Sequence, residues 1–345
     1  MTGQIPRAVL IGAGKVGAAY ASNARLTRHY QYISHAQVLS EHPGIDWVAV
    51  VDPDETAREA VRQRYGLPYA APTASELPAD CQPDLAVLAV PPDQRHLPLK
   101  NLPTVAAVVV EKPLGRNLAA SEAFAAACRE RGLLTQVNFW RRADQTYEAL
   151  ASGDLAKRVG EIQFINAYYC NGLRNNGSHI VDFVRMLAGE VDKVQLLGRY
   201  DTGCGGQPDD IDVAFALTLQ SGISATFHPL DAACYRENGL DIWGTRGRLS
   251  IVVEGLVNLF YSSRQSRSIA QDGELALDQP EQLPSTVGHA LWRLYDNLLA
   301  ALNGDAALYC PLDVAMGTER VIAEVEARAS KIGKLKMTSV TGSSQ

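Results

Sequence analysis

Short segments that are apolar throughout alternate with helical segments over the first 140 residues of the chain. A strand that is apolar on both faces belongs in a parallel sheet that helices cover on both sides. The pattern therefore predicts an α/β fold that begins with a doubly wound Rossmann domain over residues 1–140. Strands are expected in 7–11, 47–52, 84–90, 105–113 and 133–139, and helices after the glycine turn at 12–17, at 56–66 and at 117–132.

The pattern changes after about residue 145, where several segments alternate between apolar and polar residues. Such alternation is typical of antiparallel strands with one solvated face. It predicts an α+β domain over residues 141–337 with a largely antiparallel open sheet, for substrate binding and oligomerisation, whose late helices can pack back on the first domain. The polar tail 338–345 is expected to be disordered. Strands are expected at 162–169, 212–219, 223–230, 240–251 and 256–263, and helices at 178–188, 288–303 and 312–331.

Composition excludes several classes of function. The 345 residues carry a net charge of −6, which argues against nucleic acid or an acidic membrane as a partner. The six cysteines form no Cys-x-x-Cys pair, and their spacing fits neither a zinc site nor a secreted disulfide framework. The chain starts without a signal-peptide pattern, and no apolar stretch approaches the ~20 residues that cross a bilayer. We expect a cytoplasmic protein without a metal site.

The segment GAGKVG follows the first strand and has the spacing G-x-G-x-x-G. In dinucleotide-binding turns the first glycine permits the tight turn, the second lets the backbone approach a pyrophosphate, and the third lets the next helix pack closely. The phosphates then lie at the N-terminus of that helix. The predicted cofactor-binding residues of this turn are Gly12, Gly14, Lys15, Val16 and Gly17.

Asp52 ends the second strand, where a carboxylate can accept hydrogen bonds from both ribose hydroxyls. It lies farther from Gly17 than the usual ~20 residues, because an additional segment lengthens the first crossover. An acid here disfavours a 2′-phosphate, so NAD is the predicted cofactor. Arg58 nearby leaves NADP open as the alternative.

The segments GAGKVG, VVDPD, AVPPDQRH and VVVEKPLG occur in one order, and DIWGTRGRL and YDNLLAALNG follow later. Together they resemble the glucose–fructose oxidoreductase, inositol dehydrogenase and rhizopine-catabolism (Gfo/Idh/MocA) family, over residues 7–335. The resemblance implies that Lys112 of the Glu-Lys-Pro triplet faces the nicotinamide and the reacting carbinol, with Glu111 beside it. It also implies that Pro91, Pro92 and His96 line the nicotinamide cleft, although turn chemistry explains the prolines equally well.

Residues 175–182 read NNGSHIVD, which is compatible with plain helix capping and with an active site at a helix N-terminus. By the resemblance, His179 matches the family's catalytic histidine, and Asp182 one turn later can orient its ring. The family's preceding aspartate is replaced by Asn175, an amide that cannot carry a proton. We therefore predict a catalytic pair of Lys112 and His179, with Asn175 and Asp182 contributing to substrate binding.

Further polar residues precede this stretch and suit a hydroxyl-rich substrate. Asn171 and Arg174 lead into it, and Arg142 follows the fifth predicted strand. An anionic substrate group would find a fork of donors on Arg174. These three residues complete the predicted substrate-binding set.

The sequence predicts an NAD-dependent oxidoreductase that acts on a ring carbinol or ketone of a sugar or nucleotide sugar. One alternative is an enzyme that keeps NAD bound and recycles it, as in an epimerase, a sugar–sugar oxidoreductase or an NAD-dependent glycosidase. Another is a nicotinamide-binding sensor without catalysis. The resemblance implies a homo-dimer or homo-tetramer.

Overall fold

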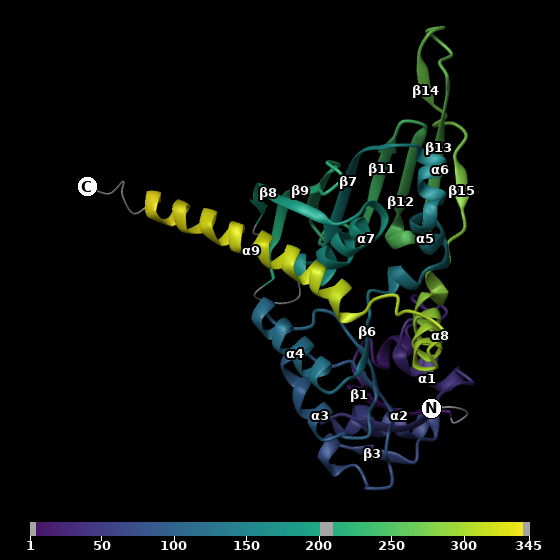
Figure 1. Cartoon of the computed structure of the whole chain (residues 1–345), viewed down its shortest axis with the longest axis vertical. Helices are drawn as coiled ribbons and strands as arrows, with labels where there is room; N and C mark the ends of the chain where they lie inside the picture. Colours follow the sequence, from purple (N-terminus) through teal and green to yellow (C-terminus); the bar gives the residue numbers. More distant parts are fainter. Residues whose placement is uncertain (1–4, 201–209, 341–345) are drawn as a thin grey trace. The chain divides into compact units, whose positions relative to one another are not determined.

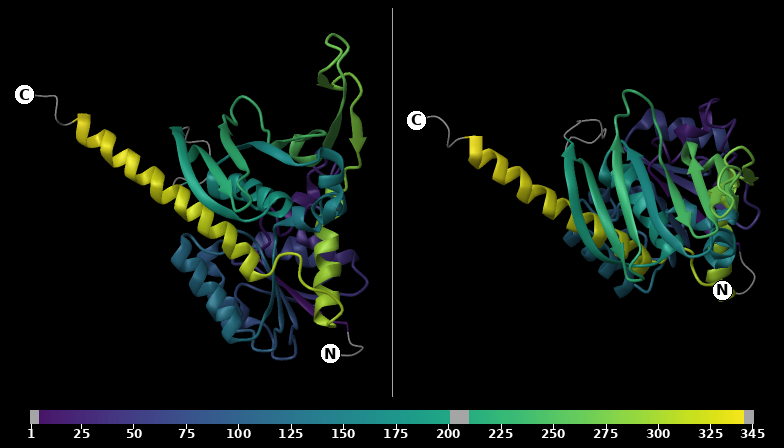
Figure 2. Two further views of the ribbon diagram at one scale, coloured as in Figure 1. Left: turned by 45° about the horizontal axis from the view of Figure 1, so that its top comes forward. Right: turned by 90° about the horizontal axis from the view of Figure 1, so that it is seen from above.

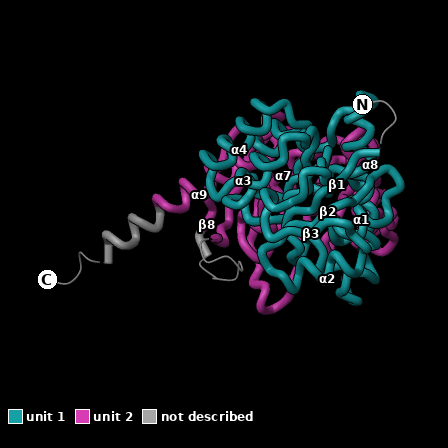
Figure 3. The backbone as a smooth tube through the Cα atoms, turned by 90° about the horizontal axis from the view of Figure 1, so that it is seen from below, with its two compact units in different colours: residues 1–144, 287–316 teal, residues 145–286, 317–345 magenta. Residues whose placement is uncertain are grey.

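The computed structural model describes residues 5–200 and 210–340. The chain forms two compact units, one of residues 1–144 and 287–316 and one of residues 145–286 and 317–345 (Figure 3). The late segment 287–316 thus belongs with the N-terminal residues. None of the helices in the described ranges is both long enough and apolar enough to span a membrane.

The first unit contains a six-stranded parallel sheet in the order β3-β2-β1-β4-β5-β6 (Figure 1). Its strands are β1 (Arg7–Ile11), β2 (Asp46–Val51), β3 (Tyr69–Ala71), β4 (Leu85–Leu88), β5 (Ala107–Val110) and β6 (Leu134–Val137). Its helices are α1 (His35–Glu41), α2 (Glu55–Tyr65), α3 (His96–Lys100), α4 (Leu118–Glu130) and α8 (Ala290–Leu302). This confirms the predicted Rossmann fold and adds β3, which is too short to give a sequence signal.

Both faces of this sheet are covered by helices. Successive side chains of each strand point to opposite faces, so they enter two different cores. In β5, Val108 and Val110 belong to a core with Phe124 of α4. Val109, between them, belongs to the other core, with Leu294 of α8. The continuous apolar strands are therefore explained by two separate helical layers.

The expected helix directly after the glycine turn is not present. Residues 14–18 form turns, a short 3-10 helix covers Ala19–Ser22, and α1 begins only at His35. The backbone N–H of His35 donates to Val16 O at 3.0 Å, and that of Ala36 donates to Gly17 O at 2.9 Å. Residues 18–34 are therefore an insertion between the glycine turn and the helix that packs on it, and we call them the insert.

The second unit contains a nine-stranded, mainly antiparallel sheet with one parallel pair, β7 and β10. Figure 2 shows its strands lying side by side. The strands are β7 (Ile162–Cys170), β8 (Val191–Tyr200), β9 (Asp212–Leu219), β10 (Ser224–Leu230), β11 (Gly239–Gly244), β12 (Gly247–Val252), β13 (Val257–Gln265), β14 (Gly273–Leu275) and β15 (Glu281–Leu283). The predicted strand at 240–251 is in fact the hairpin of β11 and β12, which turns between Gly244 and Gly247. Strands β8, β14 and β15 were not predicted, because their sequences show weak alternation or are very short.

Helices pack on one face of this sheet, as α6 contacts β11, β12 and β13 and α7 contacts β7. The helices that lie wholly or partly in this unit are α5 (Gln145–Ala149), α6 (Leu155–Val159), α7 (Ser178–Ala188) and α9 (Leu312–Val340). Helix α9 starts in the first unit and continues in the second. Helix α9 extends to Val340, and residues 341–345 lie outside the described residues, so the disordered tail at 338–345 stays a prediction.

Candidate active site

The three glycines of the turn after β1 have different surroundings. Gly12 has a φ of 99°, and a Cβ atom there would lie 2.6 Å from Ala89 O. A Cβ on Gly17 would overlap the carbonyl oxygen of Gly12, whereas one on Gly14 would meet no protein atom within 4 Å. Gly12 and Gly17 are thus required by the fold of the turn itself. Gly14 is exposed and faces open space, as expected for a position that a pyrophosphate approaches.

Asp52 lies half-buried just beyond β2 and braces the same turn. Its Oδ2 accepts the Ala13 N–H at 2.7 Å, and its Oδ1 accepts the Asp54 N–H at 2.9 Å. Each carboxylate oxygen retains a further lone pair for a ribose hydroxyl. The Arg58 guanidinium donates to the backbone oxygen of Asp52 at 2.7 Å, so its charge lies beside this carboxylate.

Glu111 and Lys112 follow β5 at the carboxyl edge of the sheet. Glu111 Oε1 accepts hydrogen bonds from Asn138 Nδ2 at 2.5 Å and from His35 Nε2 at 2.9 Å. Burial by itself raises the pKa of the Glu111 carboxyl, but His35, Asn138 and the charge of Lys112 together hold that pKa below its usual value. Glu111 is therefore an anion beside Lys112, and the pair favours the charged lysine ammonium.

Asn138 has a buried side-chain oxygen without a hydrogen-bond donor among the described residues. The residue follows β6 and donates its backbone N–H to Val110 O at 2.8 Å, at the same edge of the sheet. Buried polar atoms without a partner are uncommon in folded proteins, and one at a ligand edge indicates a donor on a ligand. The open space at Gly14, the Asp52 carboxylate and this amide oxygen together fit a nicotinamide dinucleotide.

The predicted cleft residues lie between the end of β4 and the first residue of α3. Pro91 and His96 are exposed, Pro92 is partly buried, and the His96 ring lies 5.4 Å from the ring of Phe124. Between them, Arg95 is buried and donates to Val90 O at 3.1 Å and to Pro113 O. Arg95 therefore connects this segment to the residue that follows Lys112.

In the second unit, the helix that carries His179 begins earlier than predicted, with a π-helical turn at Leu173–Gly177. Its first free N–H groups are not capped by the local asparagine and serine side chains. Asp210 instead accepts the N–H groups of Arg174 and Asn175, both at 2.9 Å, while Ser178 Oγ donates back to Arg174 O at 2.7 Å. The capping interpretation of NNGS is wrong, because a carboxylate from a distant segment supplies the cap.

The remaining predicted residues of this unit are placed as follows. The Arg174 guanidinium pairs with Glu326 of α9, and both side chains are largely buried. Asn171 adopts a positive φ of 61°, and its side chain lies near Cys170 Sγ. Asp182 is almost fully buried and accepts the Thr318 hydroxyl at 3.0 Å, with Arg185 Nη1 at 3.6 Å. Asn175 and His179 are partly exposed.

Arg142 and Lys112 belong to the first unit, whereas His179, Asn175, Asp182, Arg174 and Asn171 belong to the second. Arg142 is half-buried in a 3-10 helix over Trp140–Ala143. The assignment of catalytic and substrate-binding roles to these residues stays a prediction. Sequence reasoning missed His35, Asn138, Arg95 and Asp210. Only His35 had a usable signal, because Ser34 and Gln37 form the S-x-x-Q pattern of a helix start.

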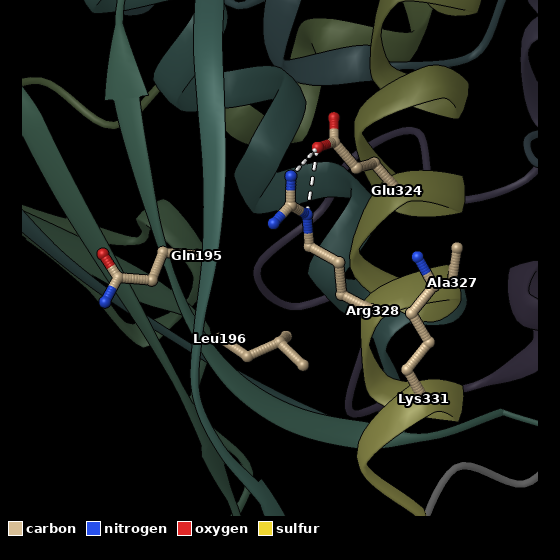
Figure 4. Close-up of a pocket in the computed structure, with 6 residues that line it drawn as sticks. All are labelled: Gln195, Leu196, Glu324, Ala327, Arg328 and Lys331. Carbon is tan, nitrogen blue, oxygen red and sulfur yellow. Dashed lines mark hydrogen bonds and ion pairs between the residues drawn. The ribbon is translucent and has the colours of Figure 1, made fainter. Parts of the chain in front are cut away.

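A pocket between β8 and α9 does not include any of these residues (Figure 4). It is lined by Gln195, Leu196, Glu324, Ala327, Arg328 and Lys331. Arg328 is held by Glu324 one helical turn away, at 2.6 Å. No group of three or more His, Cys, Asp or Glu side chains within 5–200 and 210–340 is placed to hold a metal ion.

Comparison with known proteins identifies both parts of the chain. Residues 6–139 match the oxidoreductase family with an NAD-binding Rossmann fold (GFO_IDH_MocA), and residues 156–250 match the GFO/IDH/MocA C-terminal domain. The N-terminal residues thus form an NAD-binding Rossmann domain.

Individual relatives are distant. The trans-1,2-dihydrobenzene-1,2-diol dehydrogenase of Oryctolagus cuniculus is 28% identical over 58% of this chain and 65% of its own length. The scyllo-inositol 2-dehydrogenase (NAD(+)) of Bacillus subtilis (strain 168) is 26% identical over 53% of this chain and 48% of its own length. The chain thus spans two thirds or less of these two relatives. A levoglucosan dehydrogenase solved with NADH and levoglucosan shares the fold, with a TM-score of 0.72, 16% identity, and 95% and 98% of the two chains covered.

Alanine at two of the glycines should separate packing from cofactor binding. Gly17→Ala should lower the melting temperature, because its methyl group overlaps the Gly12 carbonyl. Gly14→Ala should leave the melting temperature unchanged and weaken NAD binding about tenfold or more, roughly 1.4 kcal/mol. Calorimetry measures both quantities. Wild-type affinity in Gly14→Ala would show that no phosphate approaches this residue.

Asp52 should set both the affinity for NAD and the discrimination against NADP. Asp52→Ala removes the acceptor for the ribose hydroxyls and also removes the negative charge that repels a 2′-phosphate. The affinity for NAD should therefore fall about tenfold, and the affinity for NADP should fall much less. Asp54→Ala is the matched control. It removes the cap of α2, which costs about 1 kcal/mol of stability, but it should leave both dissociation constants unchanged. Equal losses for NAD and NADP in Asp52→Ala would contradict the assignment.

Proposed function

Because the chain belongs to the GFO/IDH/MocA oxidoreductase family, we propose that it is an NAD-dependent dehydrogenase acting on a ring carbinol of a sugar, or on the matching ketone. The observation that carries the proposal is the anionic Glu111 beside Lys112 at the carboxyl edge of the Rossmann sheet. This is the edge at which open α/β sheets bind their ligands.

Bound NAD supplies the hydride acceptor for this reaction. In the proposed oxidation, the Lys112 ammonium donates a hydrogen bond to the carbinol oxygen and stabilises the negative charge that develops on it. His179 takes the hydroxyl proton, so that the alcohol loses one hydride and one proton and becomes a ketone. Reduction of the ketone is the reverse. The roles of Lys112 and of His179 are each part of the proposal.

An uncharged cyclic polyol is the substrate class that we propose first. The names of the three relatives describe a cyclic diol, an inositol and an anhydrosugar, which all carry ring hydroxyl groups. Arg174, the expected partner of a substrate phosphate, already pairs with Glu326. A neutral sugar needs no such cation, whereas a nucleotide sugar would have to compete with this ion pair. Asn171 and Asn175 are then proposed to hold hydroxyl groups.

We further propose that the protein is a cytoplasmic homo-oligomer. Four of the described cysteines carry thiols that form no disulfide, which suits a reducing compartment: Cys81, Cys128, Cys170 and Cys234. On the sheet face away from α7, Phe164 stacks on Trp243, and Arg248 lies 4.8 Å from the Trp243 ring. Phe164 is 37% exposed, and Trp243 Nε1 is buried with no hydrogen-bond acceptor among the described residues. A second copy of this face would cover the rings and can supply the acceptor.

Lys112→Ala and His179→Ala test the reaction. NADH absorbance should be followed with inositols, cyclic diols, free sugars and UDP- and GDP-sugars, after release of any bound nucleotide. Each variant should lose about 10²- to 10⁴-fold in kcat while it keeps wild-type NAD affinity. Lys157→Ala, at an exposed lysine paired with Asp154, is the control and should keep full activity.

The outcomes separate the alternatives. Normal turnover by His179→Ala would remove His179 from catalysis. A tightly bound cofactor that is recycled without net NADH change would identify an epimerase, a sugar–sugar oxidoreductase or a glycosidase. Cofactor binding without turnover of any compound would identify a sensor.

Light scattering tests the proposed assembly. The wild-type protein should have the mass of a dimer or tetramer, and Trp243→Asp should shift the mass toward the monomer, because a buried unpaired carboxylate opposes association. Leu277→Asp, at an exposed residue of the second unit, is the control and should leave the mass unchanged. A monomeric wild-type protein would contradict the proposal.

A further inference from the structure

His35 is fully buried in the first unit and connects three elements that are distant in sequence. Its Nε2 lies 2.9 Å from Glu111 Oε1, after β5, and its Nδ1 lies 2.8 Å from the Tyr295 hydroxyl, on α8. His35 itself is the first residue of α1. A histidine with both ring nitrogens engaged has a fixed ring orientation, and the partners also determine which nitrogen carries the proton.

The direction of each hydrogen bond follows from the chemistry of the partners. The Glu111 carboxylate only accepts, so His35 Nε2 carries a hydrogen and donates it. Burial and the nearby charge of Glu111 raise the pKa of Tyr295 well above its usual value, so its hydroxyl keeps its proton. In a neutral His35 ring, Nδ1 accepts that proton in a hydrogen bond. Tyr295, His35 and Glu111 then form a directed chain of hydrogen bonds.

The same residue also connects to the cofactor turn. The backbone N–H of His35 donates to Val16 O at 3.0 Å, so its main chain contacts the glycine turn while its side chain holds Glu111. The insert separates His35 from Gly17 in sequence. The backbone bonds of His35 to Val16 and of Ala36 to Gly17 nevertheless hold the start of α1 against the glycine turn. His35 is thus the direct connection between the turn expected to hold the pyrophosphate and the residue that precedes Lys112.

We propose that His35 is a positioning residue of the dehydrogenase: held by Tyr295, it fixes the Glu111 carboxylate and, through it, the place and charge of the Lys112 ammonium relative to the glycine turn. The inference rests on the proposed function of Lys112. The groups that act on Glu111 are His35 from α1, Asn138 after β6, Lys112 next in sequence and Tyr295 from α8. The bond from His35 to Glu111 depends on the insert, because the insert must return the chain to the glycine turn with residue 35 beside Glu111.

Three variants and one control test the proposal. His35→Ala removes the donor to Glu111, His35→Gln returns an amide donor of similar reach, and Tyr295→Phe removes only the hydroxyl that orients His35. The control is His42→Gln. His42 is also a buried histidine, at the end of α1, and its Nε2 lies 3.0 Å from the Asp296 carboxylate, but it has no bond to Glu111.

The expected result in His35→Ala is a loss of about 10- to 100-fold in kcat, because the lysine is misplaced, with KM nearly unchanged. The acidic limb of the rate profile should move to higher pH, because a Glu111 that loses a donor to its ionised form binds a proton more readily. His35→Gln should recover most of the rate, Tyr295→Phe should shift the profile in the same direction, and His42→Gln should match wild type. Wild-type kcat and pH profile in folded His35→Ala and Tyr295→Phe would overturn the proposal.

A measurement without turnover keeps this test separate from that of the proposed function. In protein with carbon-13 in its glutamate carboxyl groups, the Glu111 resonance is assigned with Glu111→Gln and titrated by NMR. The wild-type resonance should titrate below the usual glutamate range, and both His35→Ala and Tyr295→Phe should raise its midpoint. An unchanged midpoint in both would overturn the role of His35 even if sugars are oxidised. A raised midpoint with no turnover of any sugar would support the relay and reject the proposed function.

Discussion

The buried carboxylate of Glu111 is the interaction on which the rest of the candidate site depends. It lies at the end of β5 and receives hydrogen bonds from α1, through His35, and from the residue after β6, through Asn138. A carboxylate is costly to bury unless donors surround it, so these elements must keep their relative positions for the charge to persist. The position of Lys112 follows directly, because it is the next residue in the chain.

A second carboxylate, that of the partly buried Asp210, organises the other unit in a comparable way. Asp210 accepts the first N–H groups of the helical segment that leads to His179, and Gly172 is required beside it because a Cβ there would overlap the carboxylate. Burial raises the pKa of Asp210 above its usual value, and the backbone N–H groups only partly oppose this. The cap therefore depends on backbone donors rather than on a basic side chain. In the first unit, residues from outside the predicted motif hold its acid in place, and in the second unit an acid from outside the motif holds the start of the helix in place.

The insert explains where local sequence reasoning was misleading. GAGKVG is followed by alanines with good helix propensity, but propensity is a weak preference that tertiary context overrides. Here the helix that packs on the turn is supplied by residues 35–41, after the chain has left and returned. The Ser34–Gln37 pattern marks the true start, although a short polar pattern is easily overlooked. The long distance from Gly17 to Asp52 was correctly attributed to an extended crossover, but its internal structure was not foreseen.

The sequence by itself determined the Rossmann sheet, the positions of its main strands along the chain, the glycine turn, the acid after β2 and the mainly antiparallel second sheet. These features follow from side-chain periodicity and from residues with unique backbone geometry, which act over a few positions. Only the tertiary structure decided that His35 and Asn138 meet Glu111, that Asp210 caps the helix of His179, and that Arg174 pairs with Glu326. Each of these contacts joins residues that are between 27 and 152 positions apart, so no local pattern records them. They arise because buried polar groups must find partners wherever the folded chain places them.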